Sequence, residues 1–419
     1  MNELLKDEFH HVLASSRRMI KILFYSILCG IIVGFVSCGF AALMNFVTTV
    51  RQSCPVLILF LPLAGLLIVG LYHLLHNEQD TGTNLVIAAL QSKDDVPLKM
   101  APSIFIGTII THLFGGSAGR EGAALQLGGS IGSSLGHAMK LRDIDTHLIM
   151  MCGMSAAFSA LFGTPMAATV FSMEVISVGI MHYSALVPCV VASFAGYAIA
   201  SHFGLSEHIF GISNLPDFTL KTGLIVVILA MLCALVSGLL CISLHTFSAL
   251  FQKYFQNPYY RAFAGGTIIA VLTLLTGGQD YNGTGVQIIV KALAGTAFPA
   301  AFLLKILFTS VTLGAGFKGG EIVPTFFVGA TFGCLFGNLI GFSPSLCAAV
   351  GMVSVFCGVT NCPISSLLIS FEMFGYDGMP FYLLACAFSY ALSGYFSLYH
   401  SQIIVYSKMH TTFINRNTR

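Results

Sequence analysis

The sequence predicts an all-α polytopic membrane protein, and three observations lead to that prediction. Hydrophobic residues make up 56% of the 419 residues and charged residues only 9%, whereas a soluble protein is about one quarter charged. Segments 22–50 and 223–252 carry no charge, and each exceeds the ~20 apolar residues that span a bilayer. The alternating segments of a membrane β-barrel are not evident. The net charge of +2 gives no indication of a nucleic-acid partner.

The chain begins with a charged segment, residues 1–20, which we expect to be cytoplasmic. It is acidic as well as basic, and the apolar run after it is too long for a cleaved signal. Basic residues border the first apolar segment, at Arg18 and Lys21, and follow the last, at Lys408 and Arg416. By the positive-inside rule both termini are therefore predicted to face the cytoplasm, with the protein in the cytoplasmic (inner) membrane.

The chain also repeats itself. The stretch GMSAAFSALFGTPMAATVFSME at 153–174 matches GMVSVFCGVTNCPISSLLISFE at 351–372 without a gap. Two further matches have an offset of 201 residues: GTNL at 82 with GTGV at 283, and glycines 128, 132 and 136 with 329, 333 and 337. We therefore expect two membrane repeats, 21–210 and 220–410, and a short cytoplasmic tail, 411–419.

Many apolar segments are short and interrupted by Gly or Pro, which predicts broken helices that meet near the midplane. In transporters such repeats usually face each other across the membrane, with the substrate site between them. Close helix packing alone can explain the four-residue glycine spacing. The twelve cysteines are scattered and contain no CxxC pair, which favours small core residues over disulfides. No metal site and no cofactor are expected.

Few charges remain within the apolar stretches, where each costs about 2.5–3.5 kcal/mol. They are Arg120, Glu121, Glu174, Lys291, Lys305, Lys318, Glu321 and Glu372. Glu174 and Glu372 end equivalent segments of the two repeats, which favours a structural role between the halves.

Arg120 and Glu121 open a glycine-flanked helix start, and Glu321 lies at another. A helix start offers free N–H groups and the positive end of a dipole, and glycine lets the backbone approach a bound ion. With the Gly-Thr pairs at 82 and 283, four such starts predict an anion cage. Glu121 would compete with the anion for this place and could also take a proton. A static Arg120–Glu121 ion pair is the alternative.

These motifs resemble the CLC family of anion channels and proton-coupled anion antiporters. GREG at 119–122 matches the family's most specific motif, GGEIVP at 319–324 its second, and GTNLV at 82–86, weakly, its first. VYSK at 405–408 looks like the start of its last helix, whose tyrosine closes the inner side of the pore. The resemblance implies a homodimer of inverted-repeat subunits, each with its own pore and with broken helices meeting at a midplane anion site.

The same resemblance implies the site residues. Glu121 is expected to be the gating and proton-transfer residue. The expected anion-binding residues are Thr83, Asn84, Gly119, Arg120, Gly122, Gly320, Glu321, Ile322, Val323 and Tyr406. For Tyr406, at the expected inner mouth of the pore, a tyrosine at the membrane–water boundary is the alternative.

Where the sequence departs from the motifs of chloride-type members, it resembles the fluoride-exporting branch of the family. Thr83 stands in the register of the anion-facing serine, Ile322 follows Glu321 where those members have phenylalanine, and Val175 replaces their proton-relay glutamate. The resemblance thus implies a proton-coupled antiporter that exports fluoride; a chloride channel or chloride/proton antiporter is the alternative. Glu121 would then move its own proton, or pass it to Glu321 or to water. We expect Glu321 to be protonated, or to hold backbone N–H groups, when the anion is bound.

An enzymatic role was weighed against transport. GGSAG at 115–119 formally fits the G-x-S-x-G elbow of serine hydrolases, but that motif needs a strand before it and a helix after it. Here it lies between apolar helical segments. His245 is the available histidine, and no orienting acid accompanies it. We therefore expect that the protein is not an enzyme.

Overall fold

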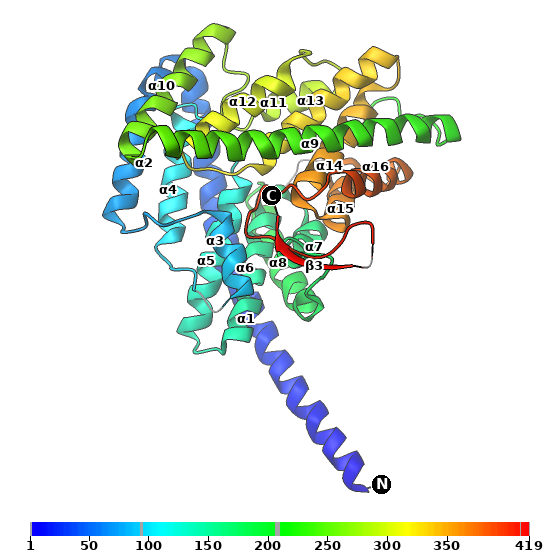
Figure 1. Cartoon of the computed structure of the whole chain (residues 1–419). Coiled ribbons are helices and arrows are strands. Elements are labelled where there is room, and N and C mark those ends of the chain that lie inside the picture. Colours follow the sequence, from blue (N-terminus) through cyan, green and yellow to red (C-terminus); the bar gives the residue numbers. More distant parts are fainter. Residues whose placement is uncertain (1, 93–94, 206–209, 411, 419) are drawn as a thin grey trace.

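The computed structural model describes residues 2–92, 95–205, 210–410 and 412–418. Sixteen α-helices and a small sheet make up this part of the chain (Figure 1). The first eight helices are α1 (Asn2–Ser53), α2 (Leu61–Leu74), α3 (Thr83–Gln91), α4 (Met100–Leu113), α5 (Glu121–Ala138), α6 (Asp143–Phe162), α7 (Pro165–Glu174) and α8 (Leu186–His202). The other eight are α9 (Leu220–Tyr254), α10 (Pro258–Thr276), α11 (Val286–Leu293), α12 (Ala301–Gly314), α13 (Ile322–Ile340), α14 (Pro344–Thr360), α15 (Pro363–Phe374) and α16 (Met379–Leu392). Two 3₁₀ helices, η1 (Pro55–Phe60) and η2 (Tyr183–Ala185), precede α2 and α8.

The second eight helices repeat the order of the first eight. Helices α5 and α13 begin 201 residues apart, at Glu121 and Ile322, and α7 and α15 begin 198 residues apart, each at a proline. Proline suits the first position of a helix, where its missing N–H would have no partner. The predicted helical repeat is confirmed. The expected boundary between an N-terminal segment and the first repeat, at residue 20, is not a structural break, because α1 is continuous from Asn2 to Ser53. The N-terminal end of α1 projects beyond the rest of the molecule (Figure 1).

Seven helical segments in the described chain are long and apolar enough to cross a membrane. They are Arg18–Ser53, Pro55–Leu74, Asp143–Phe162, Tyr183–His202, Leu220–Tyr254, Pro258–Thr276 and Ile322–Ile340. Five shorter apolar helices lie among them: α4, α12, α14, α15 and α16. The mixture of long and short helices confirms the expectation that several apolar segments are broken short of a full span.

The repeated glycines pack helices together at very short range. A Cβ on Gly128 of α5 would lie 2.2 Å from the carbonyl oxygen of Gly153 in α6. In the second repeat, a Cβ on Gly329 of α13 would lie 2.4 Å from the carbonyl oxygen of Gly351 in α14. No side chain fits in either place, so the packing explanation holds for these glycines.

Glu174 and Glu372 join the halves by exchanging helix caps. The Glu174 carboxylate, at the end of α7, accepts bonds from the backbone N–H groups of Ile364 (3.2 Å) and Ser365 (2.9 Å) at the start of α15. Glu372, near the end of α15, accepts bonds from the N–H groups of Met166 (2.8 Å) and Ala167 at the start of α7. The two helices therefore run antiparallel, each ending on the other's first turn. The interface role expected for both glutamates is confirmed, and the relation is that of an inverted repeat.

The chain ends in a small sheet and not in a helix. Strand β1 (Ser177–Val178) pairs in parallel with β2 (Ile403–Tyr406), which pairs antiparallel with β3 (Phe413–Asn417). The expectation that VYSK starts the last helix is therefore wrong. The run Ile-Ile-Val-Tyr is rich in β-branched and aromatic residues, which favour strands.

Candidate functional site

The two repeats meet through their glycine loops at the centre of the candidate site. The Gly119 N–H donates to the Gly320 carbonyl oxygen at 2.6 Å, and the Gly320 N–H donates to the Gly119 carbonyl oxygen at 2.8 Å. A Cβ on Gly320 would lie 2.4 Å from the Gly122 nitrogen, and one on Gly122 would lie 2.7 Å from the Gly320 Cα. This pairing, which we call the glycine bridge, brings the starts of α5 and α13 together.

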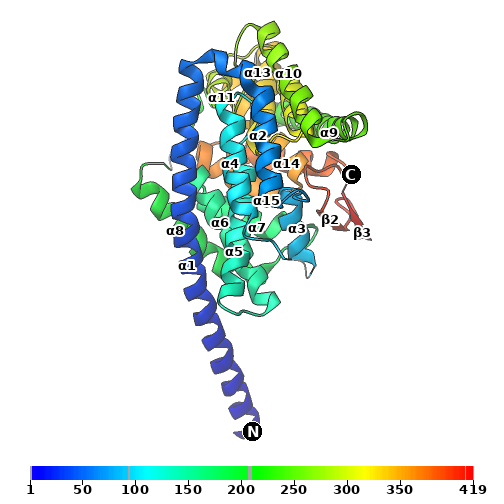
Figure 2. The same cartoon turned by 90° about the vertical axis from the view of Figure 1, so that its left-hand side faces the viewer.

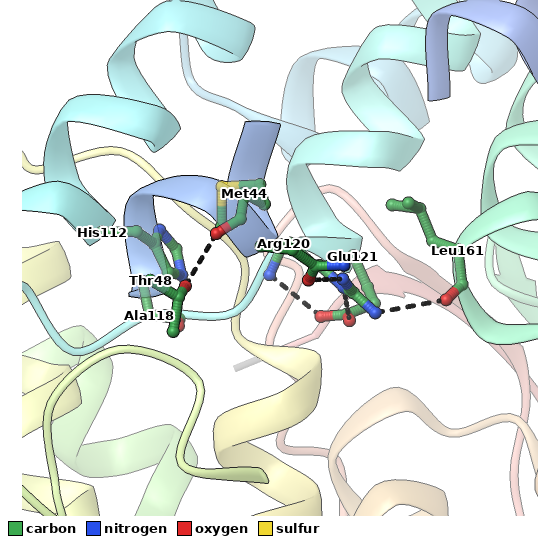
Figure 3. A network of polar contacts seen from close by, with 8 residues as sticks. Met44, Thr48, His112, Ala118, Arg120, Glu121 and Leu161 are labelled. Carbon is green, nitrogen blue, oxygen red and sulfur yellow. Dashed lines mark hydrogen bonds and ion pairs between the residues drawn. The ribbon is translucent and has the colours of Figure 1, made fainter. Parts of the chain in front are cut away.

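Glu121 is the first residue of α5, and its carboxylate is held at the start of its own helix. Its side chain is 3% exposed. Its Oε2 accepts a bond from the Arg120 backbone N–H at 3.0 Å, and its Oε1 lies 3.3 Å from the Arg120 Nε (Figure 3). The ion pair is therefore formed, but the carboxylate also occupies a backbone N–H group at the helix start, where an anion would be attracted.

Arg120 is fixed by contacts on both sides. Its Nη1 lies 3.5 Å from Oδ1 of Asn45 in α1, and its Nη2 lies 3.5 Å from the carbonyl oxygen of Leu161 in α6. The loop before it is anchored by His112, whose Nε2 lies 3.0 Å from the Ala118 carbonyl oxygen (Figure 3). The residues that flank Gly119 in the glycine bridge, Ala118 and Arg120, are thus held by hydrogen bonds with neighbouring helices.

Glu321 precedes α13, as Arg120 precedes α5. Its Oε2 is buried and has no hydrogen-bond partner in the described structure, and a Cβ on Gly122 would lie 3.2 Å from it. A buried carboxylate oxygen without a donor is costly when charged, so the position suits a protonated Glu321 or a species bound beside it. Ile322 and Val323 are buried in the first turn of α13, where backbone N–H groups have no acceptor within the helix.

Thr83 starts α3 and faces the first turns of α5. Its Oγ1 accepts a bond from Gln126 Nε2 at 3.2 Å and lies 3.4 Å from the Gly122 carbonyl oxygen. The neighbouring Asn84 bonds elsewhere, since its Oδ1 accepts from the Ser401 N–H at 3.0 Å. Gln126 is buried, and its Oε1 has no partner. Gln126 lies five residues after Glu121, the glutamate of the GREG motif. This spacing in the sequence could have identified Gln126 as a residue of the predicted site.

A pocket of about 290 Å³ adjoins these residues, and we call it the α3 pocket. Its lining includes Thr83, Asn84, Gln126, Gly319, Glu321, Tyr399, His245 and His400. Tyr399 is 1% exposed, and its hydroxyl has no partner in the described structure. A free hydroxyl donor therefore lies in the same pocket as Thr83 and Glu321.

Tyr406, predicted to line the pore mouth, does not line the α3 pocket. It is the last residue of β2, it is 42% exposed, and its ring lies 5.9 Å from that of Phe413 in an edge-on contact. Tyr399, which precedes the strand, lines the α3 pocket instead. The role of Tyr406 at the pore mouth stays a prediction.

A second pocket, of about 240 Å³, is lined by Arg120, the neighbour of Gly119 in the glycine bridge, and we call it the α11 pocket. Arg120, Arg51, Asn45, Asn282, Thr284 and Gly285 are among its lining residues. It shares no lining residue with the α3 pocket. Arg120 reaches the bridge from one pocket, and Gly319 and Glu321 reach it from the other.

The residues of the hydrolase-like motif are not arranged for catalysis. Ser117 is fully buried, and its Oγ lies 3.0 Å from the Thr309 Oγ1. His245 Nε2 lies 2.8 Å from the Ser397 carbonyl oxygen, and its ring stacks on His400 at 3.7 Å between centroids. The serine and the histidine therefore have separate partners. Within the described chain, no group of three or more His, Cys, Asp or Glu residues could hold a metal ion.

Comparisons with known proteins agree with this geometry. Residues 65–394, more than half of the chain, match the family described as voltage gated chloride channel. A chloride/fluoride channel protein of Pseudomonas syringae pv. tomato is 36% identical over 390 residues, covering 91% of this chain and 86% of that protein.

Two solved structures are similar in fold. A CLC-type fluoride/proton antiporter superposes with a TM-score of 0.88 at 32% identity, covering 92% of this chain and 98% of that one. A slow cyanobacterial Cl⁻/H⁺ antiporter superposes with a TM-score of 0.77 at 19% identity, covering 89% and 94%. The second likeness is one of fold alone.

Proposed function

The chain belongs to the voltage-gated chloride channel (CLC) family, and from that premise we propose that it is a proton-coupled antiporter that exports fluoride. The observation that carries the proposal is the position of Glu121. Its carboxylate bonds a backbone N–H group at the glycine bridge, where the two repeats meet and two separate pockets end. A carboxylate there and a mobile anion are attracted by the same helix start, so they exclude each other.

Exchange follows from this competition. Protonation removes the charge of Glu121 and weakens its bond to the Arg120 N–H, which frees the place for an anion. Deprotonation returns the carboxylate and displaces the anion. One proton and one anion therefore move in opposite directions past a single helix start.

The proton has no relay glutamate at the end of α7. Val175 occupies that position and is fully buried, while the adjacent Glu174 is occupied by the N–H groups of α15. Glu321 is the carboxylate nearest to the bridge on the α3-pocket side. We propose that Glu121 exchanges its proton with Glu321 or with water in the α3 pocket.

The choice of fluoride rests on the α3 pocket and on the relatives. Fluoride is small and strongly hydrated, so replacing its water needs donors at close range. Tyr399 and a protonated Glu321 would each offer one O–H donor. The Thr83 hydroxyl, which donates to the Gly122 carbonyl oxygen at 3.4 Å, would offer another by turning to the anion. The relative named for both chloride and fluoride is 36% identical, the fluoride/proton antiporter is 32% identical, and the chloride antiporter is 19% identical.

A chloride channel of the same fold is the second candidate, and Val175 favours it. Without a relay glutamate, proton transfer through the inner half could stop, which would leave a passive pore. Proton coupling distinguishes the two candidates directly.

We further propose that the protein lies in the cytoplasmic membrane as a homodimer with one pore per subunit, with both termini in the cytoplasm. The basic residues at Arg18 and Lys21 support this orientation, and the family resemblance supports the dimer. In this orientation the α11 pocket opens outward, because it is lined by the last turns of α1, from Met44 to Gln52.

The test is anion efflux from liposomes that contain the purified protein, recorded with a fluoride or a chloride electrode beside a pH electrode. Fluoride efflux that drives proton uptake against a proton gradient supports the proposal. Faster chloride than fluoride flux would overturn the assignment of the anion, and fluoride flux without proton movement would support the passive channel. Empty liposomes are the control.

A further inference from the structure

The second repeat contains a Gly-Thr helix start that the proposed exchange does not use. Gly283 and Thr284 lead into α11 as Gly82 and Thr83 lead into α3. Thr83 lines the α3 pocket, and Thr284 lines the α11 pocket. The α11 pocket is therefore the counterpart, by internal repeat, of the pocket assigned to the anion. In Figure 2, α11 lies near the top of the view, at the level where α1 ends. Helix α3 lies lower, below α2.

We propose that the α11 pocket is a holding site for one small monovalent anion, fluoride or chloride, with Arg51 as its central ligand. The inference deepens the proposed function and rests on it in one respect, that the chain transports such an anion. It adds a second anion-binding site to the transport pathway, and the glycine bridge separates this site from Thr83 and Tyr399.

Arg51 is the first observation. It lies on the last turn of α1 and is only 5% exposed. Its Nη1 donates to the Gln279 Oε1 at 2.9 Å, but its Nε is buried without a partner. None of the ion pairs among the described side chains involves Arg51. A buried guanidinium without a negative partner is unfavourable, so the pocket favours an anion.

Lys305 is a second buried cation, which lies behind the pocket lining and holds the segment before α11. It is 0% exposed, and its Nζ donates to the carbonyl oxygens of Tyr281 (3.1 Å) and Gly283 (2.7 Å). A Cβ on Gly283 would lie 3.0 Å from the Arg51 Nη2. The segment before α11 is thus held between two cations. Asp280 also lines the pocket, but it is exposed and forms no ion pair within the described residues.

The helix start supplies the remaining donors. Gly285 precedes α11 with a φ of +74°, and the first N–H groups of the eight-residue helix have no acceptor within it. The side chain of Thr284 offers a hydroxyl in the same pocket. Arg51, Thr284 and Gly285 at the start of α11 therefore all line one space of about 240 Å³.

The pocket is contiguous with the gate. Arg120 lines it, and Arg120 is the residue whose backbone N–H holds the Glu121 carboxylate. Arg120 therefore connects the pocket that Arg51 lines with the place that Glu121 vacates on protonation. Arg51 is consequently predicted to set the apparent affinity for anions arriving from the α11 side, and to leave the α3 side unaffected.

The test compares anion uptake in membrane vesicles of the two orientations, right-side-out and everted, which present opposite pockets to the bath. The orientation is read from a membrane-impermeant maleimide at Cys54, the exposed cysteine beside the end of α1. Arg51→Gln is expected to raise the half-saturating fluoride concentration about tenfold when the α11 pocket faces the bath, and less than twofold in the other orientation. Lys291→Gln is the matched control, because Lys291 is exposed on α11 and lies outside the pocket.

Thr284→Val serves as the second variant and keeps the test informative if Arg51→Gln does not fold. It is expected to shift the same one-sided value about threefold. An equal shift in both orientations, or no shift in either variant, would overturn the holding site. If the wild-type vesicles transport chloride and not fluoride, the proposed anion is wrong, and the same one-sided comparison made with chloride still decides the role of Arg51.

Discussion

The carboxylates of Glu121 and Glu321, from different repeats, both lie against the glycine loop at 119–122. A Cβ on Gly119 would lie 3.0 Å from the Glu121 Oε2, and a Cβ on Gly122 would lie 3.2 Å from the Glu321 Oε2. The Glu121 carboxylate accepts a hydrogen bond from a backbone N–H group, whereas the Glu321 Oε2 has no hydrogen-bond donor among the described residues. Two acidic groups with such different surroundings at one bridge are suited to different protonation states, and that difference is the basis of the predictions for both.

Replacing Glu121 with Gln should abolish proton coupling. The amide can neither carry a proton nor act as a rival anion, and flux stops as well if turnover needs the charged side chain to displace the anion. Paired fluoride and pH recordings from liposomes measure both effects. Glu78→Gln is the control, since Glu78 is 57% exposed and pairs with His73. A Glu121→Gln protein that still drives protons uphill on a fluoride gradient would refute the mechanism.

Glu321 and Thr83 should tune the choice of anion. Because both line the α3 pocket, Glu321→Gln and Thr83→Ala are each expected to change the ratio of fluoride to chloride flux about tenfold, in line with about 1.5–3 kcal/mol for a hydrogen bond to a charged group. Thr267→Ala is the matched control, because Thr267 is exposed, its hydroxyl donates to the Phe263 carbonyl oxygen, and it lies outside the α3 pocket; it should leave the ratio intact. An unchanged ratio in both pocket variants contradicts this prediction.

The two tyrosines near the C-terminus should behave differently. Tyr399→Phe removes a buried hydroxyl that has no protein partner, so the half-saturating anion concentration should rise about tenfold while the protein remains folded. Tyr406→Phe removes a hydroxyl from an exposed strand end and should change it less than twofold. Initial rates over a range of fluoride concentrations measure both. The reverse order of effects would show that the strand-end tyrosine is the one that lines the pore.

Closing the glycine bridge with a side chain should be damaging. Gly320→Ala places a Cβ 2.4 Å from a backbone nitrogen, and relieving such overpacking costs about 1–3 kcal/mol. We expect a lower melting temperature, measured by size-exclusion chromatography after heating, together with loss of flux. Gly39→Ala, in α1 with nothing within 4 Å, is the control and should be neutral or slightly stabilising. Normal flux in Gly320→Ala would mean that the bridge opens freely.

The proposed orientation can be read from a single thiol. Cys54 is exposed just after α1, and the other eleven cysteines are buried. With both termini cytoplasmic, Cys54 faces outward, so a membrane-impermeant maleimide should label it in intact cells. Cys54→Ser is the control and should remove the signal. Labelling that requires permeabilised cells would place the termini outside.

Much of the site could be predicted because the repeat marks it twice. Gly119 of GREG and Gly320 of GGE lie 201 residues apart, so the repeat assigns both glycines to the site. The α3 pocket needed information that a local pattern does not hold. Tyr399 and Tyr406 differ only in whether the chain has entered a strand, and that strand is defined by pairing with Ser177–Val178. Arg51 shows the same limit, because only tertiary folding brings it to a loop 228 residues away.

The exchanged caps of Glu174 and Glu372 also set an order for synthesis. A chain made from its N-terminus completes α7 long before Ile364 and Ser365 exist, so Glu174 at first has no donors for its carboxylate. The first turn of α7 likewise lacks the acceptor that Glu372 later provides. Unsatisfied polar groups in a bilayer raise the free energy. The first half therefore cannot adopt its final structure until the second half is translated, and until then that end of α7 has to be hydrated or shielded by insertion factors. The two halves then mature together, and a cut between them would leave each as an incomplete folding unit.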